Sequence, residues 1–568
     1  MHTLNYSKAV IVICLLVFTF FQGIISAASP DPVRGSKGMV VSASDLASQV
    51  GALILKRGGN AIDAAVATGF ALAVTYPSAG NIGGGGYMVI HLANGKNLAL
   101  DYREKAPLKS TRDMFLDSAG NFDITKSTEG FTSAGVPGSV AGLIYALEKY
   151  GTMKLEEVIQ PAVEIARDGF PLSYRLAESI SFTLPYFNKY KSSAKVFSKE
   201  GIPYKEGDIF KQPELANTLA LIQKKGKDGF YKGEVAELII KQSQQMGGLI
   251  TAEDLGKYQV MEKDVLSGSY RGYDIISMPP SSSGGVALIQ SLNILENFNF
   301  AKEDWNSSDY IHKLAEALKY VYADRSKFLG DESFVKVPKK WLISKAYAKE
   351  IFSKITSKAV ASGLILPGVP APAESEQTTH YSVVDSYGNA VSTTTTLNSS
   401  YGSKIVVEGA GFLLNNEMDD FSAKPGAPNQ FGLIGSDANS IAPGKRMLSS
   451  MTPTIVLKDN KPFIVIGSPG GSTIITVVLQ VIMNCIDFGM NIQQAVNAPR
   501  VHHQWLPDEL SYEEYGLAKD VIENLKAMGY VLSGSKILGR AEGIMVDLSN
   551  GTFYGATDPR GYGQAAGF

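Results

Sequence analysis

The stretch Glu374-Ser-Glu-Gln-Thr-Thr-His-Tyr-Ser-Val-Val-Asp385 decides how the rest of this chain is interpreted. An apolar, β-branched strand begins at Thr378, directly after residues 363–376, which are rich in Pro, Gly and Ala and indicate an exposed connector. A threonine hydroxyl is a poor nucleophile unless a base lies beside it, and the α-amine of an N-terminal threonine can be that base. The sequence therefore predicts that the chain cuts itself between Gln377 and Thr378.

A β-hairpin is expected directly after the predicted cut. Residues 378–384 and 390–396 both have strand patterns and are joined by Asp385-Ser-Tyr-Gly-Asn389. With the turn centred near Tyr387, Thr378 faces Thr396, and the same polar face carries His380, Ser382, Thr394 and Ser392. A bulge at Gly388 would shift this register by one residue. The threonine run alone indicates only β-propensity, but a polar face that reaches the predicted cut favours a reactive site.

Six separated motifs extend the argument to the whole chain. They are Pro77-Ser-Ala-Gly-Asn-Ile-Gly-Gly-Gly-Gly86, Leu100-Asp-Tyr-Arg-Glu104, Glu376-Gln-Thr-Thr-His-Tyr-Ser382, Leu414-Asn-Asn-Glu-Met-Asp-Asp-Phe-Ser422, Leu448-Ser-Ser-Met451 and Gly467-Ser-Pro-Gly-Gly-Ser472. With these motifs in this order, the chain resembles the γ-glutamyltransferases (glutathione hydrolases), which are N-terminal-nucleophile hydrolases. The resemblance implies a four-layer α/β/β/α sandwich. Pattern alone predicts only an α/β or α+β fold.

The resemblance also implies roles for the residues at the hairpin. Thr378 would be the nucleophile for self-cleavage and for turnover, with its own α-amine as the base. Thr396 would hydrogen-bond the Thr378 hydroxyl, and Asn398 would contact the α-amine end of the substrate. Packing within the hairpin is the alternative for Thr396 and Asn398.

Gly470 and Gly471 lie between an apolar strand at residues 463–466 and a helix predicted from Ile474. Glycines at such a place let backbone N–H groups point to one spot at a helix N-terminus, as an oxyanion requires. A phosphate-binding loop is the alternative, but the Gly-Lys-Ser/Thr ending of such loops is missing. We therefore predict an oxyanion site at these two glycines.

A γ-glutamyl substrate carries an α-carboxylate and an α-ammonium group at a fixed distance from its amide. Arg103 matches the family's carboxylate-binding arginine, and its guanidinium suits bidentate recognition. Ser449 and Ser450 would add hydrogen bonds to that carboxylate, and Glu417 and Asp420 would hold the ammonium. The alternative for the arginine and the acids is a solvated surface pair.

Two positions depart from the family's pattern. Phe431 lies in the loop of residues 425–432, which would form a lid, and many bacterial relatives have a tyrosine there. The aromatic gate is kept and one hydrogen bond is lost. Thr473 replaces an arginine that commonly follows Gly-Gly-Ser, which affects a contact behind the site and leaves the reaction class unchanged.

Composition and the N-terminus place the chain in a compartment. Lys8, the apolar residues 9–21 and Ser26-Ala-Ala28 predict a signal peptide over residues 1–28, with an apolar run too short for a membrane anchor. The mature protein would be a bacterial periplasmic or secreted enzyme outside the membrane. Its large subunit (residues 29–377) and small subunit (residues 378–568) would form one co-folded heterodimer. Cys485 would be a buried, inert thiol.

Several function classes are disfavoured. The net charge of −2, from 53 basic and 55 acidic residues, gives no electrostatic footprint for nucleic acid. The six histidines are scattered without metal-ligand spacing, and no dinucleotide fingerprint occurs, so no metal and no cofactor are expected. The expected substrates are glutathione and other γ-glutamyl compounds, with amino acids or peptides as acceptors. A cephalosporin or glutaryl acylase is the alternative, and an exported non-enzymatic binding protein is a weaker one.

Periodicity predicts the main elements. Helices are expected at residues 44–56, 61–74, 141–150, 155–167, 214–224, 286–295, 310–328, 474–488 and 517–528. Strands are expected at residues 86–92 and 97–102 in addition to the hairpin. We expect the region from Ser139 to Ser357 to be helical, and the region after Thr378 to be mainly β with two helices.

Overall fold

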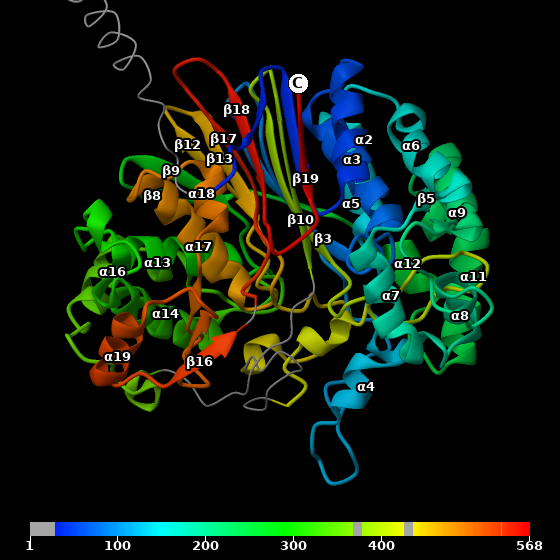
Figure 1. Ribbon diagram of the computed structural model, residues 1–568. Coiled ribbons are helices and arrows are strands. Elements are labelled where there is room, and N and C mark those ends of the chain that lie inside the picture. The colour runs from blue at the N-terminus through cyan, green and yellow to red at the C-terminus, as the bar shows by residue number, and fades with distance from the viewer. Residues whose placement is uncertain (1–28, 367–377, 425–435, 536) are drawn as a thin grey trace, which may run out of the picture. The chain divides into compact units, whose positions relative to one another are not determined.

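The hairpin that follows Thr378 forms the middle of a sheet in this computed structural model (Figure 1). β10 (Thr379–Asp385) pairs antiparallel with β11 (Ala390–Thr396), so that Thr379 faces Thr395 and His380 faces Thr394. This ladder has the predicted register from Thr379 to Val384, and the same register extended by one residue would place Thr378 opposite Thr396. Gly388 has φ 99° in the turn, and the ladder is not shifted by a bulge.

The structure describes residues 29–366, 378–424, 436–535 and 537–568. Residues 32–568 form one compact unit. The predicted signal peptide, Gln377 and Phe431 lie outside the described residues. Every helix among the described residues is too short or too polar to span a bilayer.

Within the described residues, the long strands form two seven-stranded sheets. The first sheet has the order β1 (Val33–Gly35), β18 (Phe553–Thr557), β17 (Glu542–Val546), β13 (Lys461–Gly467), β12 (Thr454–Lys458), β9 (Tyr273–Ser277) and β8 (Leu266–Tyr270). The second sheet has the order β19 (Gln564–Gly567), β2 (Gly38–Ser42), β10, β11, β3 (Gly85–His91), β4 (Asn97–Tyr102) and β7 (Met261–Lys263). Both sheets contain strands from before and after Thr378, so neither predicted subunit holds a complete sheet.

Helices cover the outer face of each sheet (Figure 1). On the second sheet these are α2 (Asp45–Lys56), α3 (Ala61–Thr75) and α5 (Ser139–Tyr150), with α6 (Leu155–Asp168) and α9 (Pro213–Lys225) behind them. On the first sheet they are α13 (Gly284–Leu295), α17 (Thr473–Ile486) and α18 (Ile492–Asn497). β10 and β11 pack on β13 and β17 between the helical layers. This arrangement, together with the similar solved structures described below, confirms the α/β/β/α sandwich.

The remaining described elements include helices outside these layers and strands of two smaller sheets. Larger helices are α7 (Tyr174–Phe187), α8 (Lys191–Phe197), α11 (Glu234–Gln245), α14 (Ser308–Phe328), α16 (Lys345–Phe352) and α19 (Lys519–Met528). Shorter helices are α4 (Ile124–Thr128), α10 (Asp228–Tyr231), α12 (Ala252–Lys257) and α15 (Lys339–Leu342). Short strands are β5 (Phe170–Pro171), β6 (Ile209–Phe210), β14 (Val501–His502), β15 (Leu510–Glu513) and β16 (Leu532–Ser535).

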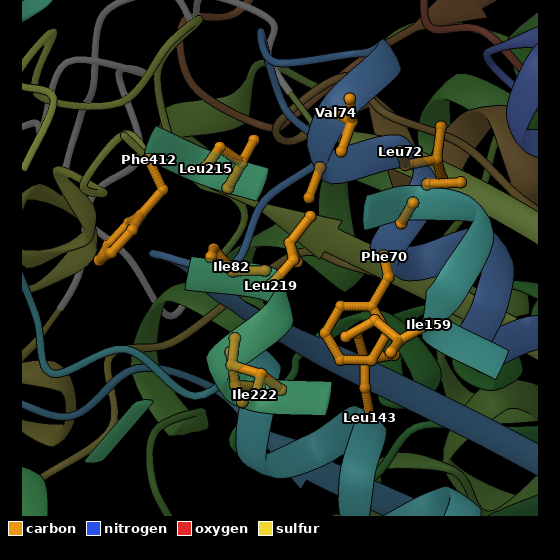
Figure 2. Packing of buried hydrophobic residues seen from close by; sticks show 14 of the residues in the cluster. Phe70, Leu72, Val74, Ile82, Leu143, Ile159, Leu215, Leu219, Ile222 and Phe412 are labelled. Atoms are coloured by element: carbon orange, nitrogen blue, oxygen red, sulfur yellow. The ribbon is translucent and has the colours of Figure 1, made fainter. Parts of the chain in front are cut away.

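The second sheet is buried on both faces. Val40 and Val383 belong to the apolar core under the helices, whereas Met39 and Val41 belong to the core between the sheets. Successive residues of a strand point to opposite faces, so both sets are apolar when both faces are covered. Figure 2 shows the helical side of this core, where Phe70 and Leu72 of α3 lie among Leu143 of α5, Ile159 of α6 and Leu219 of α9.

Two expectations about the elements are corrected. The region from Ser139 to Ser357 is not helical throughout, because β7, β8 and β9 lie within it. Arg271 and Gly272 both have positive φ and join β8 to β9 as a tight two-residue turn, which completes a hairpin signal present in the sequence. The region after Thr378 contains a third described α-helix, α18, which is only six residues long.

Candidate active site

The candidate residues of the second sheet lie at the same end of its strands, which we call one edge of the sheet. Thr378 precedes β10 and Thr396 ends the antiparallel β11, so both lie at the same end of the hairpin. Thr396 pairs with Gly85 at the start of β3, and β3 pairs in turn with the end of β4 at Tyr102. Arg103 therefore follows at the same edge, two strands away from Thr396.

The loop that carries Gly470 and Gly471 follows β13 of the first sheet and lies near this edge. A Cβ atom at Gly467, the last residue of β13, would lie 2.3 Å from Nδ1 of His380. Any residue larger than glycine would collide with that ring, so β13 approaches the polar face of β10 closely. His380 also lies 2.9 Å from the Thr394 hydroxyl and 3.0 Å from the Ser382 hydroxyl, which fixes the ring. The loop after Gly467 is therefore placed beside the start of β10.

Gly470 and Gly471 form a tight turn directly before α17. Their φ angles are 134° and 53°, a region that favours glycine. A Cβ atom on Gly470 would lie 2.3 Å from the Thr473 hydroxyl oxygen. The backbone N–H and the hydroxyl of Thr473 both donate to the Gly470 carbonyl, at 2.9 and 2.7 Å. Thr473, the residue that departs from the family's pattern, thus fixes this loop at the helix N-terminus.

The hydroxyl pair of the hairpin is buried. Thr378 is 7% exposed and Thr396 is 2% exposed. The Thr396 hydroxyl accepts a hydrogen bond from the Asn398 backbone N–H at 2.8 Å, and Asn398 has φ 75°. The Asn398 side chain donates to the Asn416 carbonyl at 2.9 Å. The end of β11 is therefore connected to the segment that carries Glu417.

Arg103 lies in a buried cluster of charges. Its Nη1 donates to Glu417 and its Nη2 donates to Asp420. Glu104 lies 3.6 Å from Nη1, so one guanidinium faces three carboxylates among the described residues. Arg103 and Glu104 are fully buried and Glu417 is 1% exposed. These residues do not form the solvated surface pair that was the alternative.

The carboxylates of this cluster resist ionisation. Burial raises the pKa of Glu104 to about 7 and raises the pKa of Glu417 and Asp420 above their ordinary values, against the opposing effect of Arg103. Burial works to lower the pKa of Arg103, yet Glu417 and Asp420 hold it above its usual range. Within the described chain, both carboxyl oxygens of Glu104 and Oε2 of Glu417 have no hydrogen-bond partner. The cluster therefore has unused capacity for a cationic donor.

Ser449 and Ser450 adjoin this cluster through other residues. Arg103 donates to the Leu448 carbonyl at 3.4 Å, just before Ser449. The Ser449 hydroxyl accepts from the Met451 backbone N–H at 3.1 Å. The Ser450 hydroxyl accepts from Nη2 of Arg325 at 2.9 Å.

Glu104 and Arg325 are the residues that the sequence reasoning missed. Glu104 lies within a quoted motif and directly follows Arg103, which was the available signal. Arg325 sits in the last turn of α14, where a basic residue normally indicates a solvated helix end. It is only 4% exposed and also donates to the Ser283 hydroxyl at 2.9 Å.

Among the described residues, no group of three or more His, Cys, Asp or Glu side chains could hold a metal ion. Cys485 is a free, buried thiol of α17, as expected, and burial raises its pKa. His502 and His503 are buried, and burial lowers the pKa of both rings, that of His502 to about 4.

Known proteins are similar to this chain in sequence and in fold. Residues 47–568 match the family model described as Gamma-glutamyltranspeptidase. The chain belongs to this family. A γ-glutamyltranspeptidase relative, the glutathione hydrolase proenzyme of Escherichia coli strain K12, is 54% identical over 93% of this chain and 91% of its own length.

Solved structures agree with this assignment. A cephalosporin acylase from Bacillus halodurans superposes with a TM-score of 0.86 at 29% identity, over 96% of this chain and 98% of the acylase chain. The γ-glutamyltranspeptidase of Helicobacter pylori superposes with a TM-score of 0.57 at 50% identity. The match covers 60% of this chain and 97% of that chain. Both solved structures therefore share the fold found here over the lengths that they match.

Proposed function

We propose that this γ-glutamyltranspeptidase-family chain is a self-processing enzyme that removes γ-glutamyl groups from glutathione and related amides. Water or the amine of an amino acid or peptide would accept the group. Family membership and the 54% identity to a glutathione hydrolase proenzyme support the reaction class. The observation that carries the substrate assignment is the buried Arg103 cluster.

The cluster suits a zwitterion. Arg103 is already paired with Glu417 and Asp420, so a bound carboxylate alone would compete with both acids. A γ-glutamyl group brings a carboxylate and an ammonium together. Its carboxylate can take over Arg103 while its ammonium takes over Glu417 and Asp420, so every buried charge keeps an opposite partner. Asn398, whose side chain donates to the Asn416 carbonyl, and Ser449 and Ser450, which follow Leu448, would complete the binding site.

Maturation would begin at the head of β10. The Thr378 hydroxyl oxygen attacks the Gln377 carbonyl carbon, the peptide C–N bond breaks, and the hydroxyl proton ends on the released α-amine. Water then hydrolyses the resulting ester, which leaves a Gln377 carboxylate and a free Thr378 hydroxyl. The new α-amine can now act as the base for the next attack.

Turnover would repeat this chemistry on the substrate. The Thr378 hydroxyl attacks the γ-carbonyl, and backbone N–H groups at Gly470 and Gly471 stabilise the oxyanion. The amine leaves with a proton, and a γ-glutamyl ester on Thr378 remains. Water or an acceptor amine then breaks this ester and restores the hydroxyl. Thr396 would orient the nucleophile through the hydrogen-bonding network at the end of β11.

The subunit arrangement follows from the position of the cut. Residues 29–377 and 378–568 would form a large and a small chain after loss of the signal peptide, with export to the periplasm or outside the cell. Both sheets contain strands from each part, so the two chains would remain together as a heterodimer. Phe431 would belong to the lid over the site.

An acylase is the second candidate function, because the acylase structure shares the fold at 29% identity. A glutaryl group has no α-ammonium and would leave Glu417 and Asp420 without a cation. The acidic surplus around Arg103 therefore favours the γ-glutamyl substrate.

The proposed function is tested by the intact mass of purified protein and by activity on a γ-glutamyl amide. We expect two chains that separate before Thr378, with the large chain starting near Ser29. Thr378→Ala is expected to remain uncut and inactive, and Thr378→Ser to cut more slowly. A folded, active protein that is still one uncut chain contradicts the proposal.

A further inference from the structure

Residues 356–365, which lie shortly before the predicted cut, are held by buried polar groups; we call this stretch the anchor segment. It follows α16, and twelve residues separate it from Thr378. Ser362 is fully buried and Ile365 is 2% exposed, whereas Leu364 and Leu366 are 78% and 79% exposed. The anchor segment is thus fixed at particular residues and is not simply a covered loop.

The first fixed point is Val360, which α14 holds with two charges. Its N–H donates to Oε2 of Glu316 at 3.2 Å, and its carbonyl accepts from Nζ of Lys319 at 2.8 Å. Glu316 and Lys319 pair at 2.9 Å, and their side chains are 0% and 1% exposed. A backbone unit held on both sides by buried charges resists displacement.

The second fixed point is Ser362, which the loop after β14 holds. Its N–H and its hydroxyl donate to the two carboxylate oxygens of Asp508, at 2.8 and 2.7 Å. Its carbonyl accepts from Nε1 of Trp505 at 2.9 Å. All the polar groups of Ser362 are therefore engaged by residues that lie after Thr378 in the sequence.

Asp508 is itself held in place as an acceptor. The Trp505 backbone N–H donates to Nδ1 of His503 at 3.1 Å, so a neutral His503 carries its hydrogen on Nε2. That Nε2 lies 3.3 Å from Oδ1 of Asp508. The nearby His503 ring, the two hydrogen bonds from Ser362 and Lys319 at 3.7 Å together outweigh partial burial and hold the pKa of Asp508 well below its usual range. Asp508 is thus an ionised acceptor at neutral pH.

Two more hydrogen bonds join the anchor segment to residues that follow the predicted cut. The Ala359 N–H donates to the Met528 carbonyl at 2.9 Å, and Nζ of Lys358 donates to the Ala527 carbonyl at 2.9 Å. The anchor segment would be near the end of the large chain, and these partners would belong to the small chain. The contacts therefore do not depend on the peptide bond before Thr378.

We propose that the anchor segment is a clamp that fixes the upstream end of the connector for self-cleavage, with Asp508 as its main positioning residue. This inference rests on the proposed cut before Thr378. The clamp and β10 then fix the chain on the two sides of residues 366–377. Fewer conformations are open to a short chain with fixed ends, so the reactive peptide reaches its attack geometry more often. After the cut, the clamp keeps the large chain's end docked and has no part in turnover.

The test separates the rate of cutting from the rate of turnover. Uncut Asp508→Asn protein is followed by intact mass as it converts to two chains, beside the wild type. The asparagine amide places an NH2 group where one of the two accepting carboxylate oxygens lies, so one donor of Ser362 loses its acceptor. We therefore expect cutting to slow about twofold, because loop-closure probability falls with the length of free chain. Turnover per cut molecule on a γ-glutamyl amide and the melting temperature should match the wild type. Glu509→Gln, on the neighbouring exposed residue, is the matched control and should cut at the wild-type rate.

A second variant tests the tether without touching the clamp. Nine Gly and Ser residues inserted after Leu366 lengthen the free chain from twelve residues to twenty-one, and cutting should again slow about twofold. Wild-type cutting rates in both variants overturn the clamp and leave the proposed function intact. Equal losses in cutting, turnover and melting temperature for Asp508→Asn also overturn it, because they indicate a purely structural contact. Failure of the wild type to cut would instead contradict the proposed function.

Discussion

Two buried charge clusters differ in how their charges are matched. Arg500 pairs with Asp558 at 2.6 Å, and Arg560 pairs with Asp558 at 3.0 Å and with Glu513 at 2.5 Å, so two guanidiniums meet two carboxylates. In the cluster around Arg103, one guanidinium meets the carboxylates of Glu104, Glu417 and Asp420.

The pKa shifts follow this difference in charge. The pKa of Asp558 is lowered, because Arg500 and Arg560 outweigh its burial. The pKa of Glu104 is raised to about 7, because burial outweighs the single guanidinium of Arg103. A balanced cluster is completed by the chain itself and supports the fold. An acidic surplus is relieved either by protonation or by a cation from elsewhere, and the ammonium group of the proposed γ-glutamyl substrate would be such a cation.

Breaking the balanced cluster should have the largest effect. We expect Arg500→Met to lower the free energy of unfolding by about 3–5 kcal/mol, because the buried acid partners lose a cation. Denaturant unfolding measures this change. KM of the remaining folded enzyme should stay unchanged. Arg167→Met, at a pair whose side chains are 58% and 63% exposed, is the control and should change stability little. An altered KM with unchanged stability would instead assign the balanced cluster to substrate binding.

Arg103→Lys addresses the unbalanced cluster. Lysine keeps the charge but cannot present two parallel donors to a carboxylate. We expect kcat/KM for a γ-glutamyl amide to fall by the factor that corresponds to a loss of about 1.5–3 kcal/mol of transition-state stabilisation. Cutting before Thr378 should be retained. Steady-state kinetics and intact mass give both readings. Arg112→Lys at an exposed pair with Asp437 is the control. Unchanged kinetics would place Arg103 outside the binding site.

Asp420→Asn tests what completes the acidic surplus. On a γ-glutamyl amide, the fall in kcat/KM of the variant should correspond to about 2 kcal/mol of lost transition-state stabilisation. The fall should be much smaller on the glutaryl analogue, which lacks only the α-amino group. Measuring both substrates in both proteins completes the cycle. Asp419→Asn is the control, because the neighbouring Asp419 accepts from the Ser127 hydroxyl at 2.5 Å. Equal losses on both substrates would assign Asp420 to the fold and favour the acylase function.

Glu104→Gln should have the smallest effect and one that depends on pH. The folded-state pKa of Glu104 is about 7 against an ordinary 4.5, so the folded chain holds a proton that the unfolded chain has lost. The stability from this proton is complete below pH 4.5 and is lost as pH rises through 7. As pH rises from 4.5 to 7, the free energy of unfolding should therefore fall by roughly 1 kcal/mol less in Glu104→Gln than in the wild type. The difference is this small because coupling to Glu417 spreads the titration over a wider pH range.

The measurement is the melting temperature of both proteins from about pH 4.5 to 8, which spans both pKa values. Glu408→Gln, on an exposed side chain, should keep the pH dependence of the wild type. Parallel curves for wild type and Glu104→Gln would show that Glu104 ionises normally, and the proposed link between burial and the acidic surplus would then be wrong.

Local features of the fold were open to prediction from the sequence. The strands Asn97–Tyr102 and Ala390–Thr396 and the register of β10 on β11 agree with the prediction, because alternation and turn residues act over short separations. The β8–β9 hairpin was missed although its Arg-Gly turn lies in the sequence. Its strands are short, and apolar helical patterns dominate on both sides.

By itself, the sequence determined which residues head the central hairpin and which glycines form the loop before α17, and it carries the prediction of the cut. Only the tertiary structure decided the electrostatics. Arg103 meets Glu417 across 314 positions of the chain, and Arg325, a helix-end residue by pattern, is 4% exposed. Periodicity reports which face of an element is apolar, but the charge balance of a buried site depends on which distant elements meet there. The fold brings the 3-10 turn Glu417–Asp420 against the residue that follows β4, and this contact sets the acidic surplus around Arg103.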